Sequence, residues 1–151
     1  MIQALPGYTV AQLLRDDPQF VLLRAVRDAD GVAVLVLVAR DGCADACLRL
    51  ENEYALRAEL DRAWAAVPLE LVRSSATLAL VLADDGVAPL SPLPAQALPT
   101  ARFVTLASAI AGALVQMHRR QLVHKDLRPE HLLVDAAGSV RLTGFGLAGP
   151  L

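Results

Sequence analysis

The sequence predicts an α+β fold in which an antiparallel sheet with one helix precedes a second, largely helical part. Short apolar runs separated by turn residues fill the first half of the chain, which is typical of strands that pair in hairpins. A long apolar segment of helical length follows a proline-rich stretch in the second half. With 151 residues, the chain corresponds to one ordinary domain or to part of a larger one.

Apolar runs predict four strands in the first half. Residues 20–27 and 31–40 are rich in Val, Leu and Ala, and the segment 28–31 where they meet contains Asp and Gly. Such a segment closes a hairpin because Asp and Gly tolerate the backbone angles of a tight turn. The other two predicted strands are 69–72 and 77–82.

Residues 44–65 are predicted to form an amphipathic helix between the two strand pairs. Apolar residues recur at a helical spacing, and charged residues separate them. The apolar positions are Leu48, Leu50, Tyr54, Leu56, Leu60 and Trp64. The predicted order is therefore strand pair, helix, strand pair.

A linker is predicted at 86–100, where several prolines remove backbone donors and restrict the chain to extended or turn conformations. Residues 101–121 follow as a strongly apolar helix that ends in basic residues, which suit a helix C-terminus. Two short strands, 132–134 and 140–142, then form a hairpin through the turn residues 135–138.

Two motifs in the second half carry the chemical signal. They are His124-Lys125-Asp126-Leu127-Arg128-Pro129-Glu130-His131 and Thr143-Gly144-Phe145-Gly146. Together they resemble the catalytic loop, H-R-D-L-x-x-x-N, and the magnesium-binding turn, D-F-G, of protein kinases. In this resemblance His131 stands at the position of the loop Asn, and Gly144 stands at that of the Asp.

The resemblance to the protein kinase family implies a kinase-like fold that is truncated after the D-F-G-equivalent turn. The implied parts are an N-lobe at 1–85, a hinge and Pro-rich linker at 86–100, and a partial C-lobe at 101–151. Within the family, the segments 5–8, 50–56 and 140–146 are similar to the N-terminal kinase-like domain of large bacterial sensor histidine kinases.

The residues that would carry the kinase reaction are incomplete. Lys125 is the only lysine of the chain, and by the resemblance Leu37 stands where a lysine normally pairs with the nucleotide phosphates. Glu53 corresponds to the helix glutamate that should bind this lysine, and it is left without its partner. Asp126 corresponds to the catalytic base and is expected to be vestigial.

Other cations and the backbone offer little replacement. Arg24, Arg27 or Arg40 could approach the phosphates from another strand, and this alternative stays open. The stretch 13–26, where a glycine-rich loop should cover the phosphates, contains no glycine. A backbone with side chains there cannot approach phosphate oxygens as closely.

No metal site is predicted. Magnesium prefers hard oxygen ligands in octahedral geometry. Gly144 offers no side chain, and His131 offers a nitrogen that suits transition metals better. The two cysteines, Cys43 and Cys47, have no nearby His and are expected to be reduced structural thiols, because a metal site needs about four ligands.

Nucleotide binding without catalysis stays an alternative. By the resemblance, the adenine pocket would be formed by Leu82, Ala83, Asp84, Asp85 and Leu133. These are apolar or main-chain contacts, which almost any sequence can provide. We therefore expect no cofactor, with ATP as the alternative.

Composition bounds the partners. The formal net charge of -2 argues against a nucleic-acid partner, because such proteins carry a basic patch. No membrane span is expected, and the chain is expected to be cytoplasmic. The hydrophobic content of 55% exceeds the usual ~45–50%, which indicates either an Ala- and Leu-rich domain or a surface covered by more chain, a protein partner or a second copy in a homodimer.

Three functions remain open from the sequence. The favoured one is a catalytically impaired kinase-like domain, a pseudokinase, that acts as a regulatory or protein-interaction module in a larger signalling protein. The second is an atypical serine/threonine protein kinase that uses ATP. The third is a nucleotide sensor that binds without transferring phosphate.

Overall fold

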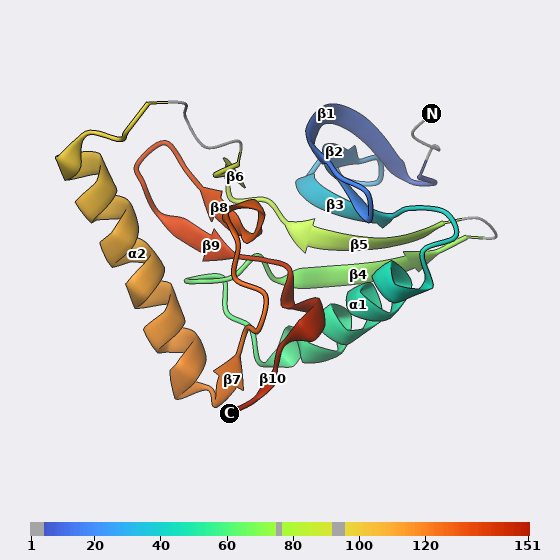
Figure 1. The fold of residues 1–151 in the computed structure, drawn as a ribbon. Helices are drawn as coiled ribbons and strands as arrows, with labels where there is room; N and C mark the ends of the chain where they lie inside the picture. The colour runs from blue at the N-terminus through green and yellow to red at the C-terminus, as the bar shows by residue number, and fades with distance from the viewer. Residues whose placement is uncertain (1–4, 75–76, 92–95) are drawn as a thin grey trace.

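A five-stranded antiparallel sheet forms the first half of the protein. The computed structural model describes residues 5–74, 77–91 and 96–151. The strands are β1 (Tyr8–Asp16), β2 (Phe20–Arg27), β3 (Ala33–Ala39), β4 (Pro68–Arg73) and β5 (Leu78–Ala83), in the spatial order β1-β2-β3-β5-β4. This arrangement confirms the predicted α+β class and all four predicted strands, and it adds β1, which the sequence did not reveal (Figure 1).

A single helix packs on the sheet. Helix α1 (Ala44–Ala55) continues into a 3-10 turn, η1 (Leu56–Ala58), and buries Ala46 and Leu50 completely against the sheet. The predicted helix 44–65 was therefore too long. After η1 the chain turns at Asp61. The carbonyl of Asp61 accepts hydrogen bonds from the amides of Trp64 and Ala65.

The second half consists of one long helix, a three-stranded sheet, a two-stranded sheet and two 3-10 turns. Helix α2 (Thr100–Arg119) agrees with the predicted helix 101–121 within two residues at each end. The remaining elements are β6 (Ala88–Pro89), β7 (Leu122–Val123), η2 (Pro129–His131), β8 (Leu132–Val134), β9 (Val140–Leu142), η3 (Phe145–Leu147) and β10 (Gly149–Pro150). The hairpin β8–β9 has the predicted bounds, and β6 extends it to three strands.

The predicted linker 86–100 contains a strand. Ala88 and Pro89 of β6 pair with Val134 and Leu133 of β8, which ties the linker to the second half of the chain. The prolines at 92 and 94 lie outside the described residues. A proline is tolerated in β6 because the strand lies at the edge of its sheet.

The central strands β2, β3 and β5 are buried on both faces, whereas the edge strands β1 and β4 are largely exposed. Leu22 and Leu35 face α1 and share one apolar cluster with Leu133 of β8. Leu23 and Val34, one residue along in each strand, belong to a second cluster on the opposite face. Burial on both faces explains why the strands are apolar runs rather than alternating patterns.

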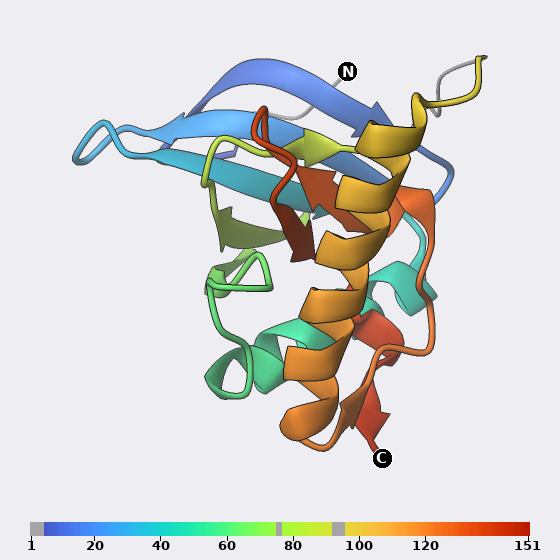
Figure 2. The same ribbon diagram turned by 90° about the vertical axis from the view of Figure 1, so that its left-hand side faces the viewer.

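Helix α2 lies on the outside of the molecule, where Figure 2 shows it along the near face. It buries Leu106, Ala113 and Met117, while Phe103 and Val115 are exposed. By length and composition alone, α2 is a helix apolar enough to cross a membrane. The sequence-based expectation of no membrane span did not anticipate this property.

Candidate functional site

The two motifs meet at one site beneath the sheet. His124 is buried, and its Nε2 donates a hydrogen bond to the carbonyl of Thr143 at 2.8 Å. Its ring lies 4.9 Å from that of Phe145, which in turn contacts Trp64 edge to face. Burial lowers the pKa of His124, so the imidazole is neutral and acts as a structural link between the loop and the turn.

The imidazole of His131 lies where a side chain on residue 144 would have to lie. Nδ1 of His131 donates to the carbonyl of Asp126 at 2.7 Å, and the imidazole is buried. A Cβ added to Gly144 would lie 2.5 Å from Cδ2 of His131, and the backbone of Gly144 is left-handed at φ 76°. The imidazole therefore fills the volume that a side chain at position 144 would need. Among the described residues no cluster of three or more metal-ligating side chains occurs.

Glu53 binds the backbone of the turn. It is the only acidic side chain of α1 that is fully buried in the described structure, and its Oε1 accepts the amide of Gly144 at 3.1 Å. The hydroxyl of Thr143 is 3.4 Å from the same oxygen. Burial raises the pKa of Glu53 to about 7, although these hydrogen bonds act in the opposite direction. The carboxyl group of Glu53 thus binds the backbone of the turn. The side chain of Leu37 lies nearby, at the position where the resemblance predicts a lysine.

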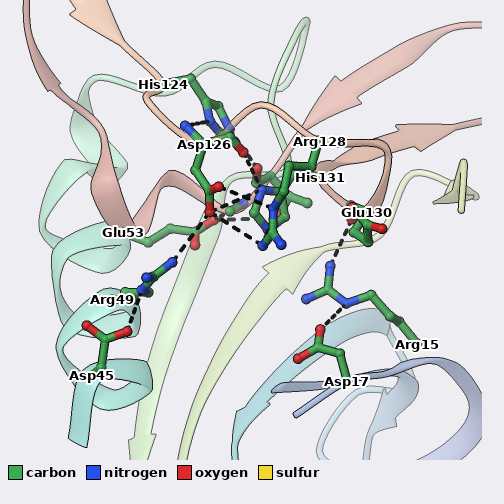
Figure 3. A network of polar contacts seen from close by, with 12 residues as sticks. Arg15, Asp17, Asp45, Arg49, Glu53, His124, Asp126, Arg128, Glu130 and His131 are labelled. Atoms are coloured by element: carbon green, nitrogen blue, oxygen red, sulfur yellow. Dashed lines mark hydrogen bonds and ion pairs between the residues drawn. The ribbon is translucent and has the colours of Figure 1, made fainter. Parts of the chain in front are cut away.

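Asp126 lies between two arginines. Arg49 of α1 places Nη1 3.4 Å from its Oδ2, and Arg128 places Nε 3.2 Å from its Oδ1. Arg49 also pairs with Asp45 one helical turn earlier. Figure 3 shows this network, with Asp126 at its centre. The ion pair with Arg49 ties the loop at Asp126 to α1.

A small cavity of about 20 Å³ lies at the centre of the site, which is room for a single water molecule. Its lining combines apolar groups with charged side chains from β1, from α1 and from the loop at Asp126. The lining residues are Arg15, Phe20, Leu37, Arg49, Leu50, Glu53, Asp126, His131, Gly144 and Gly146.

The arginines that the sequence suggested as replacement cations lie elsewhere. Arg24 pairs with Asp84 at 2.6 Å and donates to the carbonyl of Val87. Arg27 pairs with Asp30, and Arg40 pairs with Asp16. None of the three lines the cavity, whereas Arg15 and Arg49 do.

Sequence reasoning missed both of these arginines. The four-residue spacing of Asp45 and Arg49 is a signal for a helical ion pair, but it does not point to Asp126. Arg15 carries no such local signal. Lys125 does not line the cavity either; it is exposed and lies beside Gly149.

The residues that the resemblance places around adenine make contacts with other parts of the protein. Leu82 and Leu133 are completely buried and belong to the same apolar cluster. The amide of Ala83 donates to the carbonyl of Val67 at 3.0 Å. Asp84 forms an ion pair with Arg24, and Asp85 forms an ion pair with Arg62.

Comparisons with known proteins give a family. Residues 12–151 match the family described as protein tyrosine and serine/threonine kinase. CBL-interacting protein kinase 4 of Oryza sativa subsp. japonica is 29% identical over 133 residues, which is 84% of this chain and 29% of that protein.

Shorter matches have higher identity. Serine/threonine-protein kinase Sgk3 of Rattus norvegicus is 49% identical over 49 residues, which is 32% of this chain and 10% of that protein. STE20-related kinase adapter protein strd-1 of Caenorhabditis elegans is 48% identical over 36 residues, 24% of this chain and 9% of that protein. The chain therefore spans less than a third of the length of each of these relatives.

Proposed function

The chain belongs to the protein kinase family, and from this membership we propose that it is a catalytically impaired kinase-like module, a pseudokinase. Its role is to regulate or to bind other proteins in signalling. One observation carries the proposal: the buried imidazole of His131 fills the space that a metal-binding side chain at position 144 would need. The Asp and the Asn that bind magnesium in the kinase pattern are both replaced, by Gly144 and His131.

The charges of the site support this proposal. Phosphoryl transfer is catalysed mainly by positioning and by cations that neutralise the phosphates. Leu37 is buried and apolar at the expected lysine position, and Glu53 binds the turn. Asp126, the retained base, is held by Arg49 and Arg128. Glu53 and Asp126 are thus engaged by the turn and by arginines, and among the described residues no lysine lines the cavity.

A role within a larger signalling protein fits the same features. The similarity of three segments to the kinase-like domains of bacterial sensor histidine kinases favours adjacent regulatory domains in the cytoplasm. One relative is named a kinase adapter protein, which favours protein binding over catalysis. The exposed apolar side chains of α2, Phe103 and Val115 among them, offer a surface to an adjacent domain, a protein partner or a second copy.

Thermal unfolding with nucleotide tests the proposal. The 151-residue chain is heated with millimolar ATP, with and without Mg²⁺, and with inorganic triphosphate as a control for general anion effects. We expect no change in Tm, because a ligand raises Tm only when it binds the folded state. A magnesium-dependent rise that triphosphate does not reproduce would contradict the pseudokinase and favour an active site. A rise with ATP alone would favour a nucleotide sensor.

An atypical serine/threonine kinase is the second candidate, and the retention of Asp126 favours it. Two of the relatives are named protein kinases. Incubation with radiolabelled ATP and a general protein substrate measures transfer directly. If the chain is a kinase, Asp126→Asn abolishes the labelling because the catalytic base is lost. Labelling that persists in this variant comes from a contaminating kinase.

A further inference from the structure

Arg15 crosses from the sheet to the catalytic-loop region. It is the penultimate residue of β1, and its side chain is only 9% exposed. Its Nη1 donates a hydrogen bond of 2.8 Å to the carbonyl of Glu130 in η2. Figure 3 shows the guanidinium pointing from β1 toward Glu130. The two residues are 115 positions apart in the sequence, so this single contact joins the first and last parts of the chain.

Asp17 holds the guanidinium in this direction. Nε of Arg15 lies 2.9 Å from Oδ2 of Asp17, off the direction of a hydrogen bond, so the contact is an ion pair. The other carboxylate oxygen of Asp17 accepts the amides of Gln19 and Phe20. The turn after β1 therefore fixes Asp17, and Asp17 orients Arg15. A guanidinium that is already oriented loses less conformational entropy when it bonds to the loop.

The surroundings make this contact strong. Burial lowers the pKa of Arg15, whereas the neighbouring carboxylates of Asp17, Glu130 and Glu53 raise it. A charge with little solvent depends on its protein partners, since water cannot replace them. The Glu130 carbonyl is among those partners, so separation of the sheet from the loop would remove this hydrogen bond and leave the guanidinium with Asp17.

The guanidinium also fills the space under the sheet. Arg15 lines the small central cavity together with Leu37, Glu53 and His131. The remaining volume of about 20 Å³ holds no more than a water molecule. The chain thus supplies its own cation to the site from β1, on the side opposite to the strand that carries Leu37.

We propose that Arg15 is a clasp, which holds β1 down on the loop at Glu130 and keeps the space between sheet and loop closed. The clasp is a conformational contact built into the fold: release of Arg15 opens the loop without unfolding the sheet. Arg24 of β2 makes a separate contact with Asp84, directly after β5, and donates to the carbonyl of Val87, so these contacts do not depend on Arg15.

Amide hydrogen exchange of the full chain tests the clasp. The reporters are the amides of His131 and Thr143, which donate to Arg128 and His131 within the loop region. The variants are Arg15→Ala and Arg15→Gln, the second of which keeps most of the side-chain volume. Arg40→Ala is the matched control, since Arg40 bonds to Asp17 and Asp16 of the same turn but makes no contact with the loop.

We expect both reporter amides to exchange more than about fivefold faster in the two Arg15 variants and less than about fivefold faster in Arg40→Ala. If the reporters stay below this threshold in both Arg15 variants, the clasp is wrong. If Arg40→Ala accelerates them equally, the effect comes from the turn alone and the proposal also fails. The experiment contains no nucleotide, so its outcome is independent of the proposed function.

Discussion

The imidazole of His131 fills the space that a side chain at position 144 would need, so the residues at these two positions depend on each other. A Cβ at position 144 would lie between 2.5 and 2.7 Å from three ring atoms of His131, closer than side chains pack. A side chain cannot return to position 144 without a steric conflict as long as His131 keeps its imidazole. This coupling can be measured because both residues lie in the described core of the site.

Gly144→Asp alone should destabilise the protein, by about 1–3 kcal/mol, because overpacked side chains force shifts of neighbouring groups. In the double variant Gly144→Asp/His131→Asn the smaller amide leaves space, so the steric part of this loss should be recovered, whereas the strain of a side chain at φ 76° remains. Urea unfolding of the two single variants and the double variant gives the interaction energy. Additive effects of the two substitutions would show that the residues do not compete for space.

The pH dependence of stability should carry a contribution from Glu53. Its pKa in the folded protein, about 7, is higher than the usual glutamate value of 4.5, so the folded state binds more protons between these two pH values. The stabilising contribution is complete below about pH 4.5 and is lost as the pH rises through about 7. The loss amounts to roughly 3 kcal/mol, because one pKa unit corresponds to about 1.4 kcal/mol.

Glu53→Gln isolates this contribution, since the amide cannot ionise. Urea unfolding at pH 5 and pH 8 should show a larger loss of stability at the higher pH in the parent than in Glu53→Gln. The two buried histidines, His124 and His131, have lowered pKa values and act in the opposite direction. Their contribution is the same in both proteins, so it cancels in the comparison. An equal pH dependence in both proteins would refute the role of Glu53.

Phe145 should be a structural residue of the turn. It is completely buried between His124 and Trp64, and Phe145→Ala should cost about 3–5 kcal/mol of stability. Leu147 in the same 3-10 turn is 41% exposed, so Leu147→Ala should cost less than about 0.5 kcal/mol. Chemical unfolding measures both. A small effect at Phe145 would mean that the turn is not anchored by its ring.

Gly146 should be intolerant of any side chain, whereas Gly112 should not. A Cβ on Gly146 would lie 2.5 Å from Cβ of Arg49 and 3.0 Å from its Cα, so α1 would be pushed away from η3. A Cβ on Gly112 in α2 meets nothing within 4 Å. Gly146→Ala should therefore lower Tm, and Gly112→Ala should stabilise by about 0.5–1 kcal/mol through helix propensity. A similar response of Tm to both substitutions would contradict the close packing of α1 and η3.

Much of the fold follows from local patterns in the sequence, and the exceptions have physical causes. Strand β1 was not predicted because register shifts between Val10 and Gln12 and between Leu13 and Arg15 interrupt the alternation of its side chains. The helix after β3 was predicted too long because Leu60 and Trp64 continue the apolar spacing. Both are buried in the cluster around Phe145, where a turn serves as well as a helix.

The candidate site, like the fold, could be predicted from the sequence only in part. The spacing of the two motifs predicted that His131 and Gly144 stand at the positions of the kinase's metal ligands, and the structure brings the two residues together. The spacing could not predict Arg15, because the contact with Glu130 depends on how β1 lies over the loop. Nor could it predict that Asp84 would be occupied by Arg24. Such contacts depend on tertiary packing, which no local pattern encodes.

Lys125 gives the protein an unusual chemical property. It is the only lysine of the sequence, it is exposed, and it has a left-handed backbone at φ 65°. An amine-reactive fluorophore would meet no competing side-chain amine, because arginine guanidinium groups stay protonated and unreactive at the pH used for labelling. The dye would then be attached one residue from His124 and Asp126, where its emission reports on the loop itself.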